Sequence, residues 1–256
     1  MLLKSGRAPS CRRPTPRPLL DRLHACHEAA RTRDRRIVWF FDLDNTLHDA
    51  SHAIFATIDR RMTEYVERYL QVDRVQANHL RLTYWRRYGA TMLGLMRHHA
   101  VDPHHFLRET HDFDIAGLLR AERGLARLFA RLPGRKVLLT NAPGAYADDV
   151  LRALGLHRGV LARYAIEQMR VHRTFRPKPS RSMLRHMLAR ERVPSSRAVL
   201  VDDSTVNLRA ARAVGFRTVL VIGHNRSPSR LRCGSYVGMR VRSVLELPRA
   251  RARLRN

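Results

Sequence analysis

The chain has 256 residues, which is enough for one large domain or for a domain that carries an insertion. Its hydrophobic content of 44% supports a buried core, and it contains no stretch of about 18 apolar residues, which excludes a membrane-spanning helix. The formal net charge of +27 invites a nucleic-acid-binding interpretation.

Much of this positive charge lies near the two ends of the chain. Residues 1–36 hold ten Lys or Arg against three acidic residues, and residues 225–256 hold nine against one. Of the 49 basic residues only three are Lys, a preference more typical of codon bias than of a binding surface. We therefore expect no specific nucleic-acid partner, but weak, salt-sensitive electrostatic binding through the basic tails 1–20 and 249–256.

The three cysteines carry no metal-binding pattern. Cys11, Cys26 and Cys233 are odd in number and far apart, so no pair has the spacing of metal ligands. The first 20 residues lack the apolar centre of a secretory signal. Together these features favour a location in the reducing cytoplasm.

A tail, a short helix and a strand are expected first along the chain. Residues 1–20 are rich in Arg and Pro and predict a disordered tail, and residues 21–34 predict a short helix. Residues 36–41 form a run of β-branched and aromatic residues that is short enough for a buried strand. This strand ends directly before two acidic residues, Asp42 and Asp44.

A block of helices is expected after this strand. Residues 49–121 contain no strand-like run and are too long for an ordinary crossover, so they predict an all-α helical cap inserted over the sheet. Apolar residues recur there at spacings of three and four, as on one face of a helix. They are Ile54, Phe55, Ile58, Met62, Tyr65, Val66 and Tyr69 and, further along, Tyr84, Trp85, Tyr88, Met92, Leu95 and Met96.

The rest of the chain alternates between strand-like and helical patterns. Apolar runs predict strands at 135–143, 196–204 and 216–225. Helical patterns lie at 145–154, 180–191 and 205–214. The alternation predicts an α/β fold, a Rossmann-like parallel sheet flanked by helices, whose core is formed by residues 21–48 and 122–248. Ligands of such sheets bind beyond the carboxyl ends of the strands.

Two pairs of acidic residues stand where strands are expected to end. If Asp42 and Asp44 continue the first strand, their carboxylates lie about 6.6 Å apart on one face. There they repel by about 2.5 kcal/mol at an effective dielectric constant of about 20. Asp202 and Asp203 end a later strand, so a hard cation, most commonly Mg²⁺, is expected among these oxygen ligands. The alternative is that the aspartates only cap the turns or helices that follow.

Two further features at strand ends suit a phosphate group. Thr140 and Asn141 offer a hydroxyl and the backbone N–H groups that open the next helix, although they also fit an N-cap. Lys178 lies between Pro177 and Pro179, which stiffen its backbone, so it predicts a placed point charge where an ordinary surface Lys is the alternative. Together with the acidic pairs, these residues predict phosphoryl transfer.

With these motifs in this order, the sequence resembles the haloacid dehalogenase (HAD) superfamily of phosphohydrolases over residues 36–223. "DLDNT" matches its first motif, D-x-D-x-T, "LLTN" the second, Lys178 the third and "VDDS" the fourth. The helices expected at 49–121 are similar to the helical cap that the superfamily carries between its first and second motifs. The resemblance therefore implies a HAD-type core with an inserted cap.

The resemblance also implies roles for individual residues. Asp42 is implied as the nucleophile that forms an aspartyl-phosphate, and Asp44 as the general acid and base. Thr140 is implied to bind phosphate with Asn141 nearby, and Lys178 to hold Asp42 and the phosphate together. The implied Mg²⁺ ligands are the Asp42 side chain, the Asp44 backbone carbonyl and Asp203, with Asp202 assisting. Asp44 argues against the dehalogenases themselves, which lack this second acid.

Several phrases resemble the pyrimidine 5′-nucleotidase branch of the superfamily. They are "FFDLDNTLHDAS", "YWRRYGATMLGL" (84–95), "LLTNAPGAYADDVL" and "VDDSTVNLRAARAVG". The cap phrase matters most because caps govern substrate choice, although Tyr84, Tyr88 and Met92 also fit plain packing. We expect hydrolysis of a pyrimidine nucleoside 5′-monophosphate, UMP or CMP, with sugar phosphates or phosphoglycolate as the alternative. His48 and His52 are expected to be turn or surface residues.

A function of another class is a catalytically idle fold whose basic tails contact nucleic acid. The intact set of Asp42, Asp44, Thr140, Lys178 and Asp203 favours an enzyme, because an idle domain has no physical need for all five. Nucleic-acid binding that persists at about 0.2 M salt would favour the binding protein.

Overall fold

The structure, a computed structural model, describes residues 37–224 and 234–250. The predictions for residues 1–20 and 21–34 fall outside the described part of the chain, as do residues 251–256 of the tail predicted at 249–256. Within the two described ranges, none of the helices has the length and apolar character that a membrane crossing requires.

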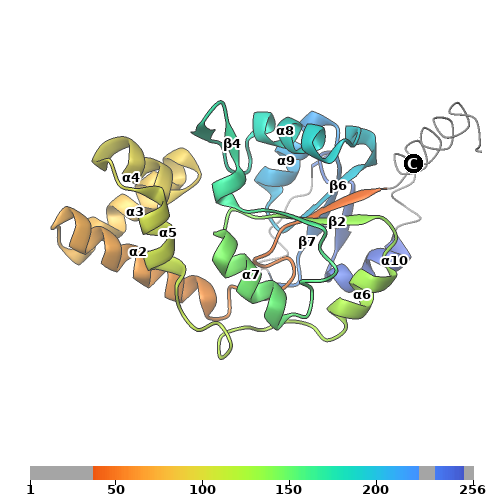
Figure 1. Ribbon diagram of the computed structural model, residues 1–256, viewed down its shortest axis with the longest axis horizontal. Helices are drawn as coiled ribbons and strands as arrows, with labels where there is room; N and C mark the ends of the chain where they lie inside the picture. Colours follow the sequence, from red (N-terminus) through yellow and green to blue (C-terminus); the bar gives the residue numbers. More distant parts are fainter. Residues whose placement is uncertain (1–36, 225–233, 251–256) are drawn as a thin grey trace, which may run out of the picture. The chain divides into compact units, whose positions relative to one another are not determined.

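A parallel sheet lies at the centre of the fold (Figure 1). Its strands follow the order β3-β2-β1-β6-β7-β8. The strands are Val38–Phe41 (β1), Arg135–Leu139 (β2), Ala162–Tyr164 (β3), Ala198–Asp202 (β6), Arg217–Val221 (β7) and Met239–Val241 (β8). Val38 lies opposite Arg135 of β2 on one side and Ala198 of β6 on the other. The predicted α/β fold with a parallel sheet is confirmed, and β3 and β8 are additions that the sequence patterns did not predict.

Helices cover both faces of the sheet. They are α8 (Arg181–Glu191) and α9 (Thr205–Val214) on one face and α6 (Leu125–Arg131), α7 (Gly144–Ala153) and α10 (Leu247–Ala250) on the other. Alternate residues of β1 point to opposite faces, so Val38 and Phe40 pack on the first layer and Trp39 and Phe41 on the second. Burial on both faces explains why β1 is apolar throughout.

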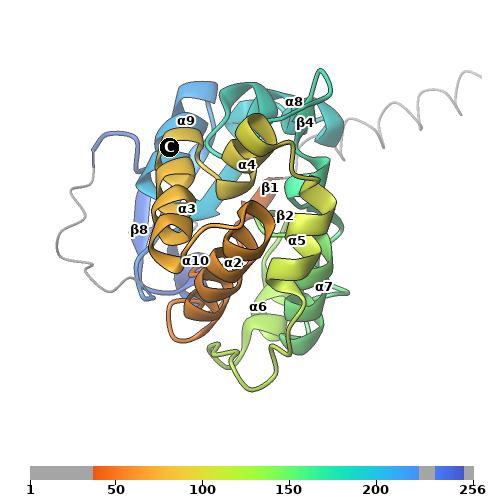
Figure 2. The same ribbon diagram turned by 90° about the vertical axis from the view of Figure 1, so that its left-hand side faces the viewer.

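The segment between β1 and α6 is helical and has a core of its own. It contains α2 (Ile54–Leu70), α3 (Arg74–Tyr88), α4 (Thr91–His99) and α5 (Pro103–His111), which gather into one group in Figure 2. Tyr65, Tyr84, Met92 and Phe106 are buried together between these helices. We refer to α2–α5 as the cap helices, and the cap boundaries 49–121 stay a prediction.

The apolar stripe predicted from Tyr84 to Met96 does not lie on one continuous helix. Helix α3 ends at Tyr88, and Gly89 follows with a φ of 82°, a left-handed conformation that suits Gly and ends the helix. Trp85 also departs from the stripe, because it is 57% exposed while Tyr84 is buried. Helical spacing alone therefore did not distinguish core residues from residues that face a cavity.

Candidate active site

Polar side chains from three neighbouring strands meet at the carboxyl edge of the sheet. Asp42 directly follows β1, Thr140 follows β2, and Asp202 is the last residue of β6. Because β1 lies between β2 and β6, this edge is the point at which ligands bind in open α/β sheets. The carboxylates of Asp42, Asp202 and Asp203 each bring an oxygen within 4.8 Å of the others.

The loop after β1 separates the two acids of the first motif. The strand ends at Phe41, and the N–H of Leu47 donates to the carbonyl of Leu43 at 2.8 Å to close a tight turn. Asn45 takes a φ of 58°, a conformation that Asn tolerates better than most residues. The side chains of Asp42 and Asp44 therefore point from the start of a turn and have different partners. They do not share one strand face as we expected.

Lys178 bridges two of the acidic side chains. Its Nζ donates to Oδ1 of Asp42 at 2.6 Å and to Oδ2 of Asp202 at 2.8 Å. Lys178 is only 3% exposed, and burial alone would lower the pKa of its ammonium group. The two carboxylates instead raise that pKa above its usual value, so Lys178 is a fixed cation at the sheet edge.

The backbone of Lys178 is held by the side chain of Asn141. Lys178 follows a short hairpin formed by β4 (Arg170–Val171) and β5 (Thr174–Phe175). The Asn141 amide donates to the Lys178 carbonyl at 3.0 Å, and its oxygen accepts from the Lys178 N–H at 2.9 Å. Asn141, which the sequence placed near a phosphate, thus positions the segment that carries the lysine.

The two acids that follow β6 have different surroundings. Asp202 is fully buried and accepts from Lys178, the Ser204 N–H at 2.9 Å and the Asn207 amide at 3.0 Å. Asp203 is half-buried and lines a cavity. Burial, together with the neighbouring carboxylates of Asp202 and Asp42, raises the pKa of Asp203 to about 8. Asp203 is therefore the acid of this pair with room for a further ligand.

Carboxyl groups outnumber cations at the sheet edge. Burial raises the pKa of Asp42 to about 7, even though Lys178 acts to lower it and Asp202 raises it further. One ammonium group thus faces three carboxylates, those of Asp42, Asp202 and Asp203. A hard divalent cation is the kind of ligand that offsets such an excess.

Asp44 is oriented by two buried donors. Tyr146 donates to Oδ1 of Asp44 at 2.7 Å, and Nε2 of His48 lies 3.0 Å from the same oxygen. Burial tends to raise the pKa of Asp44, but these two hydrogen bonds bring it below its usual value. His48 directly follows the turn but is fully buried, which corrects our expectation only as far as a surface residue is concerned. Its Nδ1 has no hydrogen-bond partner among the described residues, so Nε2 is assigned as the donor nitrogen.

A cavity of about 440 Å³ lies between this edge and the cap helices. Asp42, Asp44, Lys178 and Asp203 line one side of it, and residues of α2, α3, α4 and α5 line the other. His111, at the end of α5, is among them, and burial lowers its pKa to about 4 despite the opposing effect of Asp44. This volume lies within the usual range of small-ligand pockets.

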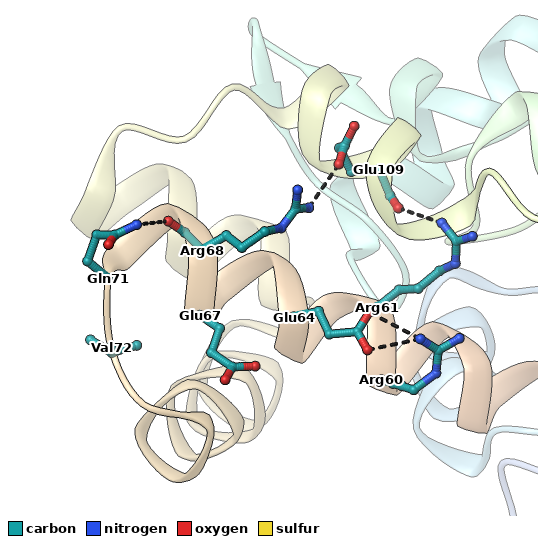
Figure 3. A pocket seen from close by; sticks show the side chains of 8 residues that line it. All are labelled: Arg60, Arg61, Glu64, Glu67, Arg68, Gln71, Val72 and Glu109. Carbon is teal, nitrogen blue, oxygen red and sulfur yellow. Dashed lines mark hydrogen bonds and ion pairs between the residues drawn. The ribbon is translucent and has the colours of Figure 1, made fainter.

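A larger hollow, of about 850 Å³, lies on α2 and α5 (Figure 3). Four of its charged side chains form ion pairs: Arg60 with Glu64 and Arg68 with Glu109, each at 2.9 Å. None of the acidic groups at the sheet edge lines this hollow. The smaller cavity is therefore the candidate active site.

Tyr146 and His48 are the site residues that sequence reasoning missed. Tyr146 lies in the first turn of α7, inside a phrase that we quoted only for its family resemblance. It meets Asp44 across 102 positions of the chain, so no local pattern connects the two. A polar aromatic residue just after the second motif was the one available signal.

Comparisons with known proteins agree with this architecture. A family model described as haloacid dehalogenase-like hydrolase matches residues 38–215. Phosphate metabolism protein 8 of Saccharomyces cerevisiae is 24% identical over 200 residues, which cover 72% of this chain and 61% of that protein. The chain therefore spans about three fifths of the length of this curated relative.

Solved structures show the same fold at low sequence identity. CbbY from Rhodobacter sphaeroides, in complex with phosphate, has a TM-score of 0.59 and 22% identity, with 83% of this chain and 96% of that chain covered. L-2-haloacid dehalogenase from Xanthobacter autotrophicus has a TM-score of 0.54 and 16% identity, with 85% and 98% covered. At these identities the likeness shows the fold alone.

Proposed function

Because the chain belongs to the haloacid dehalogenase-like hydrolase family, we propose that it hydrolyses phosphate monoesters and that Mg²⁺ assists the reaction. The observation that carries this proposal is the buried cluster of Asp42, Lys178 and Asp202 at the edge of a cavity that fits a small ester. Asp44 favours phosphate transfer over dehalogenation, because an alkoxide leaving group needs a proton and a halide does not.

The donor set fits Mg²⁺. Every group in it is an oxygen, and a bound cation would favour the charged forms of Asp42 and Asp203, whose pKa values burial and the neighbouring carboxylates raise. We assign the Asp42 and Asp203 side chains and the Asp44 backbone carbonyl as ligands. Asp202 assists by holding Lys178, because its oxygens already accept several hydrogen bonds. When bound, Mg²⁺ supplies positive charge that offsets the charge of the phosphate.

Asp42 acts as the nucleophile in this proposal. One carboxylate oxygen attacks phosphorus, the bond to the ester oxygen breaks, and an aspartyl-phosphate forms. Lys178, 2.6 Å from Oδ1 of Asp42, holds this carboxylate and offsets the charge of the transferred group. The Thr140 hydroxyl accepts from the Ala142 N–H at 3.0 Å, which directs its own O–H to a phosphate oxygen.

Asp44 moves the protons. In the first step it donates one to the leaving alcohol, which requires that Asp44 first bind a proton when the negative charge of the bound phosphate raises its lowered pKa. In the second step it removes one from the water that attacks the aspartyl-phosphate. Tyr146 and His48 both bond to Oδ1, so Oδ2 is the oxygen assigned to carry the proton. Asn141 contributes indirectly, because its amide fixes the backbone of Lys178.

The substrate that we propose is a pyrimidine nucleoside 5′-monophosphate, UMP or CMP. Support comes from the resemblance of residues 84–95 to the pyrimidine 5′-nucleotidase branch and from the fact that several of these residues line the cavity. Sugar phosphates and phosphoglycolate are the alternative within the same reaction. The cytoplasmic location expected from the cysteines suits a nucleotide substrate.

A substrate panel tests this proposal directly. The purified protein is incubated with Mg²⁺ and nucleoside monophosphates, sugar phosphates, phosphoglycolate or a chlorinated acid, and the release of phosphate or chloride is measured. We expect phosphate from UMP and CMP and no release after chelation with EDTA. Activity that survives the chelator contradicts the metal assignment, and chloride release without phosphate release contradicts the proposed reaction.

A further inference from the structure

The cap side of the cavity is mostly apolar but contains one strong donor. Its apolar lining includes Ile58, Met62, Leu82, Met92, Phe106 and Leu107. Arg81 of α3 is the one Lys or Arg that the described cap helices contribute to this lining. A leaving group that fills this side therefore offers apolar surface and an acceptor for a guanidinium group.

Arg81 is held in place from several directions. Its Nη1 donates to Oδ1 of Asp59 at 2.6 Å, and its Nε and Nη2 donate to Oδ1 of Asn78 at 3.3 and 3.0 Å. The Thr91 hydroxyl donates to the Arg81 carbonyl at 3.0 Å. Within the described part of the chain, these contacts engage three of the five N–H groups of the guanidinium. Arg81 is thus a positioned donor that keeps capacity for a ligand.

Trp85 lies one helical turn after Arg81, so both side chains lie on the same side of α3. Its indole is 57% exposed although it lines the cavity. Gly89 and Ala90, where α3 gives way to α4, line the cavity as well. An exposed indole beside small residues offers a flat apolar face to a ring, and stacking between aromatic side chains and bases tolerates any base.

We propose that Trp85 and Arg81 select the leaving group: Trp85 stacks on a flat heterocycle and Arg81 donates to a carbonyl oxygen at its edge. This inference rests on the proposed phosphatase function and assigns substrate choice to two named residues. A pyrimidine nucleotide satisfies both requirements, since uracil and cytosine each have a flat face and a carbonyl. Adenine has the face without a carbonyl, and ribose 5-phosphate has neither.

The test compares kcat/KM for UMP, AMP and ribose 5-phosphate in the full-length protein with Mg²⁺. The variants are Trp85→Ala and Arg81→Lys, which keeps a cation beside Asp59. The matched controls on the same helix are Val75→Ala and Arg86→Met, because both residues are exposed and neither lines the cavity. Thermal unfolding of each variant shows whether the fold is intact. Hydrolysis of p-nitrophenyl phosphate measures the activity on an ester that has no nucleobase.

The expected changes differ between the two variants. Trp85→Ala lowers the ratio of kcat/KM for UMP to that for ribose 5-phosphate by at least about 5-fold. Arg81→Lys lowers the ratio for UMP to AMP by about 5- to 10-fold, and the control variants change neither ratio. Equal losses on all substrates, or unchanged ratios, overturn the inference. If the unaltered protein releases phosphate from none of the esters, the proposed function fails instead.

Discussion

Two charged regions of the molecule differ in what surrounds their ions. In the hollow of Figure 3, Arg60 forms an ion pair with Glu64. The side chain of Arg60 is 53% exposed and that of Glu64 is 38% exposed. At the sheet edge, Lys178 forms ion pairs with Asp42 and Asp202. The exposed fractions of these three side chains are 2%, 10% and 0%, in that order. The exposed pairs are solvated whether or not they meet, but the buried ions depend on one another.

Neither the size of a cavity nor the number of its charged residues alone identifies the site in this molecule. The hollow on α2 and α5 has about 850 Å³ and the cavity at the sheet edge about 440 Å³. The hollow balances acidic and basic side chains, whereas the cavity faces more carboxylates than cations. The smaller cavity is distinguished by buried ionisable groups that lack a full set of partners, because a ligand that binds there would stabilise their charged forms.

The largest contrast is expected between Asp42→Asn and a variant in the hollow. Asp42→Asn removes the proposed nucleophile, so we expect kcat for phosphate release to fall by at least about 10⁴-fold. Glu64→Gln serves as the matched control and keeps full activity. Phosphate release from p-nitrophenyl phosphate with Mg²⁺ measures both, and thermal unfolding confirms the fold. Near-normal turnover in Asp42→Asn excludes Asp42 as the nucleophile.

A smaller loss is expected from Tyr146→Phe, which removes one of the two hydrogen bonds to Oδ1 of Asp44. For an alkyl phosphate, whose leaving group needs a proton, kcat/KM falls by about 10- to 100-fold. For p-nitrophenyl phosphate, whose leaving group is stable as an anion, it falls by less than about 5-fold. Tyr69→Phe, on the exposed part of α2, changes neither value. Similar losses on the two esters contradict the positioning of a general acid by Tyr146.

The half-buried His111 predicts a pH effect on stability from the cap side of the cavity. Its pKa is about 4 in the folded protein against 6.5 for an ordinary His, so the unfolded chain binds more protons between these values. The stability that depends on the uncharged ring is complete above pH 6.5 and is lost as the pH falls toward about 4. The full pKa difference corresponds to roughly 3 kcal/mol, and because the ring is partly exposed to solvent we expect a loss of about 2 kcal/mol in the free energy of unfolding.

Urea unfolding at several pH values measures this effect. His111→Gln removes its share of the decline, and the exposed His186→Gln serves as the control. A decline in His111→Gln that matches the unaltered protein shows that other groups cause the acid sensitivity.

The smallest effect on stability is expected at the exposed Arg60–Glu64 pair. Exposed ion pairs contribute little, so Glu64→Gln lowers the free energy of unfolding by less than about 0.5 kcal/mol. Urea unfolding at low and high salt measures the change. A loss above about 1 kcal/mol in low salt would show that the hollow is more than a set of solvated pairs.

Strands and site residues that belong to a strong local sequence pattern could be predicted from the sequence. The apolar runs of β1, β2, β6 and β7 are long enough to stand out, whereas β3 and β8 have three residues each and show no period. Asp42 directly follows β1, and Asp202 and Asp203 stand at the end of β6 and just after it, so their approach follows from strand pairing alone.

Residues that act through distant contacts could not be predicted. Asn141 meets Lys178 across 37 positions, and its amide binds backbone atoms that any residue type would offer. Trp85 has the same apolar character whether it packs in a core or lines a cavity, so its exposure follows only from the break at Gly89 and the packing of α3. The roles of Asp202 and Asp203 differ for the same reason, because only the fold decides which of them faces Lys178.

The position of β1 in the sheet has a consequence for synthesis on the ribosome. Val38 pairs with Ala198, which lies 160 positions later in the chain, so one side of β1 has no partner until β6 emerges. At bacterial or eukaryotic rates of elongation, this interval is on the order of 10 s. An unpaired apolar strand is a template for pairing with other chains. We expect the nascent protein to depend on chaperones most during that interval, before β6 pairs with β1 and brings Asp202 beside Asp42.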